Sequence, residues 1–171
     1  MRTLLIAAVI AGGAGARANP PTLVSQEAGA FAVSLPKAWT VVSNAAQGTI
    51  IAQQDPTRKD AAQLMLMVAP HTQASDDEVL DTVLKNGLPN AKVTKREALP
   101  NGGGKLLVAD GEAEGITARL GAIAVAASGG VIVGVLIAKP ADFDTVGGVN
   151  TVVAVLASMR ITGGVAPAGF T

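Results

Sequence analysis

The 171-residue sequence contains no cysteine and no tyrosine, and it has a single histidine. Without cysteine the chain forms no disulfide, so a hydrophobic core alone must hold the fold together. A domain near 150 residues buries about 70% of the surface that its unfolded chain exposes, which is sufficient for that purpose. The absence of cysteine also excludes a lipid-modified cysteine as a membrane anchor.

Charged residues are scarce as well, at 15% of the chain, with 13 basic residues and 13 acidic ones. If a leader that contains Arg2 and Arg17 is removed, 11 basic residues remain against 13 acidic ones, which gives a net charge of −2. This charge provides no bulk attraction to nucleic acid or to an anionic membrane. We therefore expect neither as a partner.

No catalytic set is recognisable in the sequence. His71 is the only histidine available as a base for a serine nucleophile, and neither a G-x-S-x-G nor an H-E-x-x-H pattern occurs. The glycine run before Lys105 lacks the first glycine of a phosphate-binding loop, and Leu106 stands where that loop needs serine or threonine. We therefore expect no enzymatic activity and no cofactor.

The N-terminus has the pattern of an export signal. Arg2 precedes an apolar run over residues 3–11, which is far too short to cross the roughly 30 Å of hydrocarbon in a bilayer. The small-x-small pattern at residues 16–18 matches a signal-peptidase site. We predict a signal peptide over residues 1–18 and a mature protein in the periplasm or outside the cell, with no stable membrane anchor. The alternative is a retained N-terminal helix, which the glycine- and alanine-rich sequence disfavours.

Two segments have helical patterns. Ser75 followed by Glu78 is a capping box at a helix start, and Gly87 suits the left-handed position after the last turn. The apolar residues of this helix recur at helical spacing: Val79, Leu80, Val83 and Leu84. A second helix is expected over residues 142–159, where Gly147 and Gly148 each cost about 1 kcal/mol and so delay or fray the first turn.

The remaining ordered segments have the patterns of strands. They cover residues 31–35, 48–54, 63–69, 92–98, 105–111, 116–126 and 131–138. Helices segregated from antiparallel strands indicate the α+β class, and strands that are apolar on both sides indicate a sheet covered on both faces. We predict an antiparallel sheet of about six to seven strands with a helix on each face, in a single domain over residues 31–162. A lead-in over residues 19–30 precedes it and a flexible tail over residues 163–171 follows.

A loose motif adds a family resemblance. Its residues are Phe31, Val33, Leu35, Pro36 and Trp39 in the pattern F-x-V-x-L-P-x-x-W, followed at the end of the domain by M-R-I at Met159, Arg160 and Ile161. With the order of elements, this resembles the PsbP-like superfamily, which includes extrinsic photosystem II subunits and DcrB-like bacterial envelope proteins. The resemblance covers residues 31–161 and implies an α/β/α sandwich with a non-enzymatic accessory or protein-binding role. A glycine usually precedes the tryptophan of this motif, and here Ala38 stands there.

The candidate site is a row of carboxylates, Asp110, Glu112 and Glu114. If the strand continues through Gly111, the three side chains share one face. Such a row has the hard oxygen ligands that Ca²⁺ prefers, and it also suits a basic partner. The alternative is a solvated strand end or hairpin loop, because Gly111 and Gly115 interrupt strands, with Arg119 and Lys105 nearby to neutralise the row.

Two smaller charged groups have simpler interpretations. Asp77 and Asp81 lie one helical turn apart and face either a cation or the helix dipole, which favours acidic residues in the first turn. Lys92, Lys95 and Arg96 form a small basic patch without interleaved aromatic residues, which is typical of a solvated strand face.

Two functions remain open at this stage. The first is an exported accessory module that binds another envelope or secreted protein through its sheet or hairpin rim. The second is a periplasmic carrier of a small apolar ligand or lipid, in which the many alanine and glycine residues leave space between helix and sheet. The carrier predicts an internal apolar pocket.

Overall fold

A computed structural model of the chain describes residues 23–28, 31–45, 49–70, 74–100, 103–127 and 130–161. The predicted signal peptide, the predicted tail and His71 lie outside these described residues.

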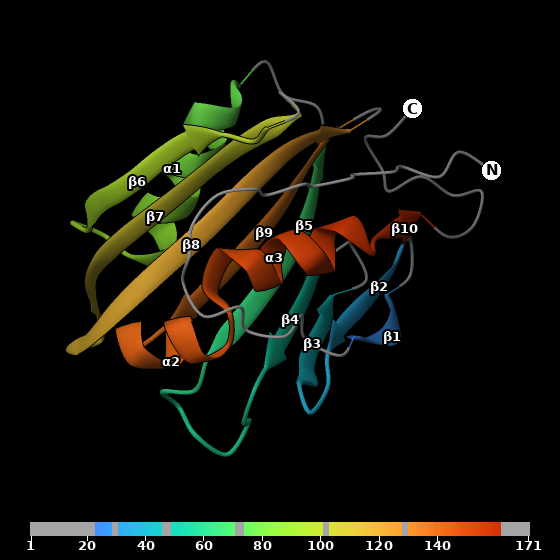
Figure 1. Cartoon of the computed structure of the whole chain (residues 1–171), viewed down its shortest axis with the longest axis horizontal. Coiled ribbons are helices and arrows are strands. Elements are labelled where there is room, and N and C mark those ends of the chain that lie inside the picture. Colours follow the sequence, from blue (N-terminus) through green and yellow to red (C-terminus); the bar gives the residue numbers. More distant parts are fainter. Residues whose placement is uncertain are drawn as a thin grey trace.

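Seven strands form one antiparallel sheet in the order β3-β4-β5-β9-β8-β7-β6 (Figure 1). In chain order they are β3 (Thr40–Ala45), β4 (Thr49–Gln53), β5 (Gln63–Pro70), β6 (Lys92–Ala98), β7 (Gly104–Ala113), β8 (Ile116–Ala127) and β9 (Gly130–Ala138). The edges of this sheet are β3 and β6. The predicted sheet of six to seven antiparallel strands is confirmed.

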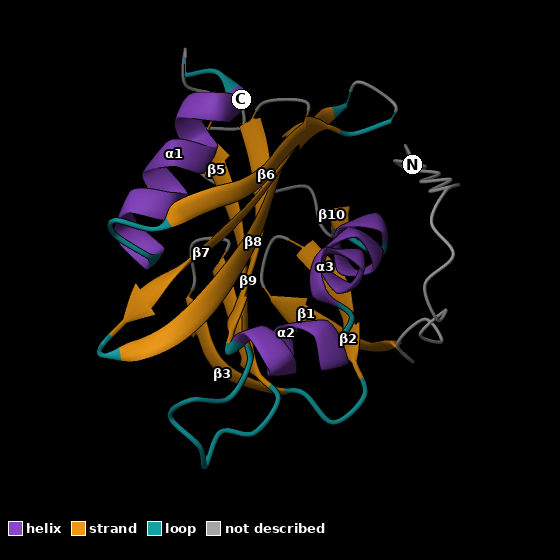
Figure 2. Ribbon diagram, turned by 60° about the vertical axis from the view of Figure 1, so that its left-hand side comes forward, coloured by secondary structure: helices purple, strands orange, loops and turns teal. Residues whose placement is uncertain are grey.

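Helices lie on both faces of the sheet, as predicted. Helix α1 (Asp76–Gly87) packs on β7 and β8, while α2 (Pro140–Thr145) and α3 (Gly148–Ala157) pack on β8 and β9. Figure 2 shows α1 on one side of the sheet and the other two helices on the opposite side. A small sheet of β1 (Leu23–Ala28), β2 (Phe31–Pro36) and β10 (Arg160–Ile161), in the order β1-β2-β10, lies beside α3.

Two features of the small sheet differ from the sequence prediction. The predicted lead-in over residues 19–30 contains a strand, because residues 23–28 pair in antiparallel register with all six residues of β2. The strand that starts at Phe31 therefore belongs to a separate layer rather than to the main sheet. Ser158, after α3, holds this layer in place, since its Oγ accepts a hydrogen bond from the Ser34 amide at 2.8 Å.

The second predicted helix is broken into α2 and α3. Gly147 and Gly148 adopt φ values of 92° and 55°, in the left-handed region that interrupts a right-handed helix. A Cβ atom on Gly148 would lie 2.8 Å from the ring of Phe143, so the break also brings the backbone against an aromatic side chain. A single helix over residues 142–159 was therefore wrong, and the two glycines are the cause.

The start of α1 confirms the predicted capping box. The Ser75 amide donates to Glu78 Oε2 at 2.7 Å, and the Glu78 amide donates to Ser75 Oγ at 3.3 Å. The hydrogen bonds that the Glu78 carboxyl accepts from the Ser75 amide and, at 3.0 Å, from the Ser75 hydroxyl hold its pKa below its ordinary value. The end of the helix was predicted wrongly, because Gly87 is its last residue and Asn90 takes the left-handed conformation at φ 65°. Gly87 instead permits a close approach to Leu120, whose Cδ1 would lie 3.1 Å from an added Cβ.

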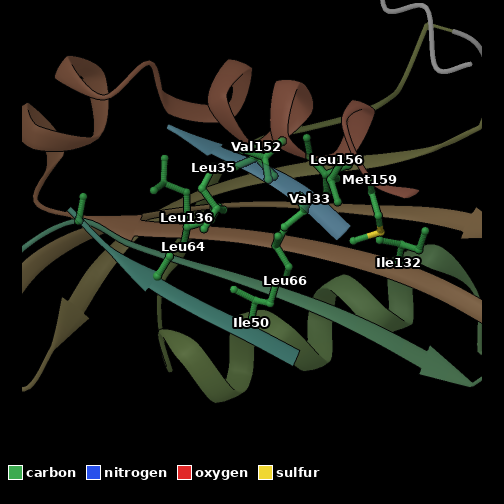
Figure 3. Close-up of a cluster of buried hydrophobic side chains, with 14 of the residues drawn as sticks. Val33, Leu35, Ile50, Leu64, Leu66, Ile132, Leu136, Val152, Leu156 and Met159 are labelled. Atoms are coloured by element: carbon green, nitrogen blue, oxygen red, sulfur yellow. The ribbon is translucent and has the colours of Figure 1, made fainter. Parts of the chain in front are cut away.

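The main core fills the space between the sheet and the layer formed by α2, α3 and β2. Figure 3 shows side chains from five elements that converge there. They are Val33 and Leu35 of β2, Ile50 of β4, Leu64 and Leu66 of β5, Ile132 and Leu136 of β9, and Val152 and Leu156 of α3, together with Met159. Burial of each such side chain stabilises the fold by roughly 1.5–3 kcal/mol.

A second core lies under α1. Leu80 and Val83 of the helix, together with Leu88, pack on Leu107 of β7 and Leu120 of β8. The two cores explain the uninterrupted apolar runs of β8 and β9, since these strands are buried on both faces.

Candidate functional site

The predicted carboxylate row lies at the end of the β7–β8 hairpin. Asp110 and Glu112 are in β7, which continues through Gly111 to Ala113, so this glycine does not interrupt the strand. Glu114 is in the two-residue turn to β8, at φ 50°, and is followed by Gly115 at φ 78°. Because the strand ends before Glu114, the three carboxylates do not continue one strand face.

The Asp110 carboxylate forms an ion pair with Arg119, which lies directly opposite in β8. Arg119 Nε donates to Asp110 Oδ1 at 2.7 Å, and Nη2 donates to Oδ2 at 3.1 Å. This bidentate pair lowers the pKa of the Asp110 carboxyl and raises that of the guanidinium.

Arg119 also connects the sheet to α2. Its Nη1 lies 3.4 Å from Asp144 Oδ1, and its guanidinium lies 5.9 Å from the centre of the Phe143 ring. These contacts are an ion pair and a cation–π interaction with the helix that covers this end of the sheet. Asp110 thus orients an arginine that anchors α2.

The geometry gives the Ca²⁺ hypothesis no preformed site. Within the part of the chain that the structure describes, no group of three or more metal-ligating side chains is close enough to hold an ion. Glu112 and Glu114 are exposed, and neither forms an ion pair with another described residue. Ca²⁺ binding by Asp110, Glu112 and Glu114 therefore stays a prediction for experiment.

The acidic residues Asp77 and Asp81 of α1 pair with basic residues of the sheet, one of which, Arg96, belongs to the predicted basic patch. Asp77 accepts from Arg96 Nη1 at 3.1 Å and from the ammonium group of Lys105, and Asp81 accepts from the same guanidinium. The Lys105 hydrogen bond, followed by that of Arg96, holds the pKa of the Asp77 carboxyl below its ordinary value. The cation that faces the acidic end of α1 is therefore supplied by β6 and β7 of the same chain.

Little remains of the predicted basic patch. Arg96 is held by α1, and Lys95 Nζ lies 2.8 Å from Glu97 Oε1 in the same strand. Among the three predicted members, only Lys92 forms no ion pair with a described residue. This arrangement supports the solvated strand face and not a nucleic-acid platform.

Sequence reasoning missed two exposed apolar side chains near the carboxylate row. Val93 of β6 is 39% exposed and Ile116 of β8 is 38% exposed. Val93 lies opposite Ala109, and Ile116 lies opposite Ala113. Ala109 and Ala113 are four residues apart in β7, so all four side chains lie on one face of the sheet, the face that α1 covers. The register of the three strands places them on this face, with Val93 on the β6 side of β7 and Ile116 on the β8 side.

No protein-family model and no curated protein matches this sequence. Among solved structures, the chain is similar to the cyanobacterial PsbP (CyanoP) from Synechocystis sp. PCC 6803, with a TM-score of 0.51 and 16% identity over 88% of this chain and 98% of that one. The chain has a PsbP-like fold. It is also similar to LpqN, described as involved in cell envelope biogenesis of Mycobacterium tuberculosis, with a TM-score of 0.51 and 15% identity over 86% of this chain and 88% of that one.

The sheet and the helices α2 and α3 are closely packed, whereas a carrier of an apolar ligand would need space between helix and sheet. A Cβ atom on Gly134 would lie 2.7 Å from Val152 Cγ1, and one on Gly121 would lie 2.8 Å from the Phe143 ring. Helix side chains thus fill the space in front of the two sheet glycines that face α2 and α3, and they leave no room there for a single methyl group.

None of the helices in the described part of the chain is both long enough and apolar enough to cross a bilayer.

Proposed function

We propose that this protein is an exported, non-enzymatic accessory module of the cell envelope that acts by binding another protein. The observation that carries the proposal is the PsbP-like fold, shared with a cyanobacterial PsbP and with a protein described as involved in cell envelope biogenesis. The export signal predicted from residues 1–18 supports the same compartment.

The electrostatics of the described residues are those of structural ion pairs and a helix cap. The carboxylates that have shifted pKa values have them lowered, as expected for ordinary ion pairs and caps. Their partners are residues that fasten the helices to the sheet, such as Arg119 and Arg96. A general acid or base would instead show a pKa moved towards neutrality in a cleft.

Export is tested by producing the full chain in a bacterial host with two membranes and separating the cell fractions. We expect the mature protein in the periplasmic or extracellular fraction, with Asn19 as its first residue. The matched control is Ala18→Asp, which removes the small residue that the peptidase needs and leaves an unprocessed chain. Recovery of uncleaved wild-type protein in the cytoplasm would contradict this part of the proposal.

Protein binding is tested by a pull-down from envelope extract with the mature chain as bait. We expect reproducible enrichment of at least one envelope or secreted protein over a tag-only control. If replicate experiments enrich nothing, the accessory role is wrong.

A further inference from the structure

The β7–β8 hairpin extends past both of its neighbours. Strand β6 pairs with β7 only as far as Asp110, and β9 pairs with β8 only as far as Arg119. The hairpin pairing continues to Ala113 and Ile116. Figures 1 and 2 show its end reaching beyond the other strands and clear of the helices. We define residues 112–117 as the hairpin tip.

The two sides of the hairpin tip have different chemistry. Ala113 and Ile116 point to the same side of the sheet as Val93 of β6, so the apolar side of the hairpin tip has one exposed aliphatic residue, Ile116. Glu112 and Thr117 point to the opposite side, and both are exposed. With Glu114 in the turn, the hairpin tip carries two carboxylates that form no ion pair within the described part of the chain.

Glu114 is poorly suited to its position as far as folding is concerned. Both central residues of the turn have positive φ, which is the geometry that favours glycine, asparagine and aspartate. The glutamate side chain forms neither a hydrogen bond nor an ion pair with a described residue to offset this cost. Strained residues that bring no benefit to the fold are concentrated at functional sites.

We propose that the hairpin tip is the docking element of this module and that it binds a segment of an envelope protein carrying lysine or arginine beside an aliphatic side chain. The segment crosses the end of the hairpin: its basic groups face Glu112 on one side and Glu114 in the turn, and its aliphatic group covers Ile116 on the other side. Charge complementarity decides the occupant, because the unpaired charges of the hairpin tip are all negative while the other acidic groups nearby are already paired. This inference rests on the proposed function and names the surface and the partner chemistry.

The test places a photo-reactive benzoylphenylalanine at Thr117, on the hairpin tip, or at Thr82, an exposed control position on α1. Each variant is expressed with its leader, irradiated in intact cells, and the cross-linked peptide is sequenced. We expect an adduct from position 117 and none from position 82, with lysine or arginine in the captured peptide. The double variant Glu112→Gln/Glu114→Gln should lower its yield about tenfold, the effect of two exposed ion pairs.

A separate variant distinguishes folding from binding. Glu114→Gly places the preferred residue in the turn, so the melting temperature should rise while the yield of the adduct falls. Loss of both stability and adduct would contradict the proposal.

The remaining outcomes separate the two levels of the account. The pull-down can enrich a partner that is cross-linked only from position 82, or equally well by the double variant. This result would contradict docking at the hairpin tip and would leave the accessory role unaffected. The absence of a partner in both experiments overturns both.

Discussion

Ala38 provides a direct test of the local physics of this fold. It lies in the turn between β2 and β3 at φ 72°, and the Trp39 amide donates to the Pro36 carbonyl at 3.1 Å across the turn. A turn closed in this way with a positive φ at its third residue is of type II, which favours glycine at that position. The PsbP-like motif usually has glycine there, and this chain places an alanine in the same strained conformation.

Ala38→Gly is therefore expected to stabilise the protein. An alanine in the left-handed region costs about 1–2 kcal/mol, and the added freedom of glycine in the unfolded chain offsets about 0.4–1 kcal/mol of the gain. Because Ala38 is exposed, no buried packing is lost. The net increase of roughly 0.5–1 kcal/mol corresponds to a melting temperature about 2–3 °C higher for a domain of this size.

The assay is calorimetric or urea unfolding of the mature chain beside a matched control. Ala154→Gly makes the same change at a half-buried position inside α3, where glycine should destabilise by about 1 kcal/mol. Opposite signs for the two variants support the reasoning. If both variants lose the same stability, the strain assigned to Ala38 is refuted.

Three further predictions concern packing, pH and metal. Gly134→Ala should destabilise by about 1–3 kcal/mol in urea unfolding, because the new methyl group overlaps Val152; an unchanged midpoint would show that space exists there. The pKa of Asp110 is lowered by Arg119, so its stabilisation is present above about pH 4 and is lost as the pH falls through the folded pKa. Thermal melts of Asp110→Asn should accordingly show a weaker acid dependence than the wild type, and equal curves would count against this. Thermal melts with and without millimolar Ca²⁺ test the metal hypothesis: an increase in the melting temperature that Glu112→Gln removes would support it, and an unchanged melting temperature would contradict it.

Local signals in the sequence predicted the parts of the fold that depend on neighbouring residues. The Ser75–Glu78 capping box predicted the start of α1, and the short apolar run over residues 63–69 predicted β5. The segregation of helices and strands then gave the layered α+β architecture.

Features that depend on contacts between distant residues could not be predicted from the sequence. Strand β1 has a weak pattern of its own and forms because β2 offers an edge for pairing. Gly147 and Gly148 were recognised as weak points of a helix, but the left-handed conformations that break it into α2 and α3 were not predicted.

The candidate site shows the same division. Arg119 was recognised as a neighbour that neutralises the carboxylate row, but Lys105, the other expected neighbour, pairs with Asp77 on the opposite face of the sheet. The placement of Val93 and Ile116 on one face follows from strand register, since these residues are 23 positions apart in the sequence. Three-dimensional placement was needed to find the apolar side of the hairpin tip.

The most direct measurement of the central claim compares two baits in a quantitative pull-down from envelope extract. One bait is the wild-type mature chain, and the other carries Glu112→Gln, Glu114→Gln and Ile116→Thr. We predict that the wild-type bait enriches an envelope protein that the triple variant fails to retain, while both baits melt cooperatively. Identical sets of enriched proteins, or none on the wild-type bait, would contradict the account.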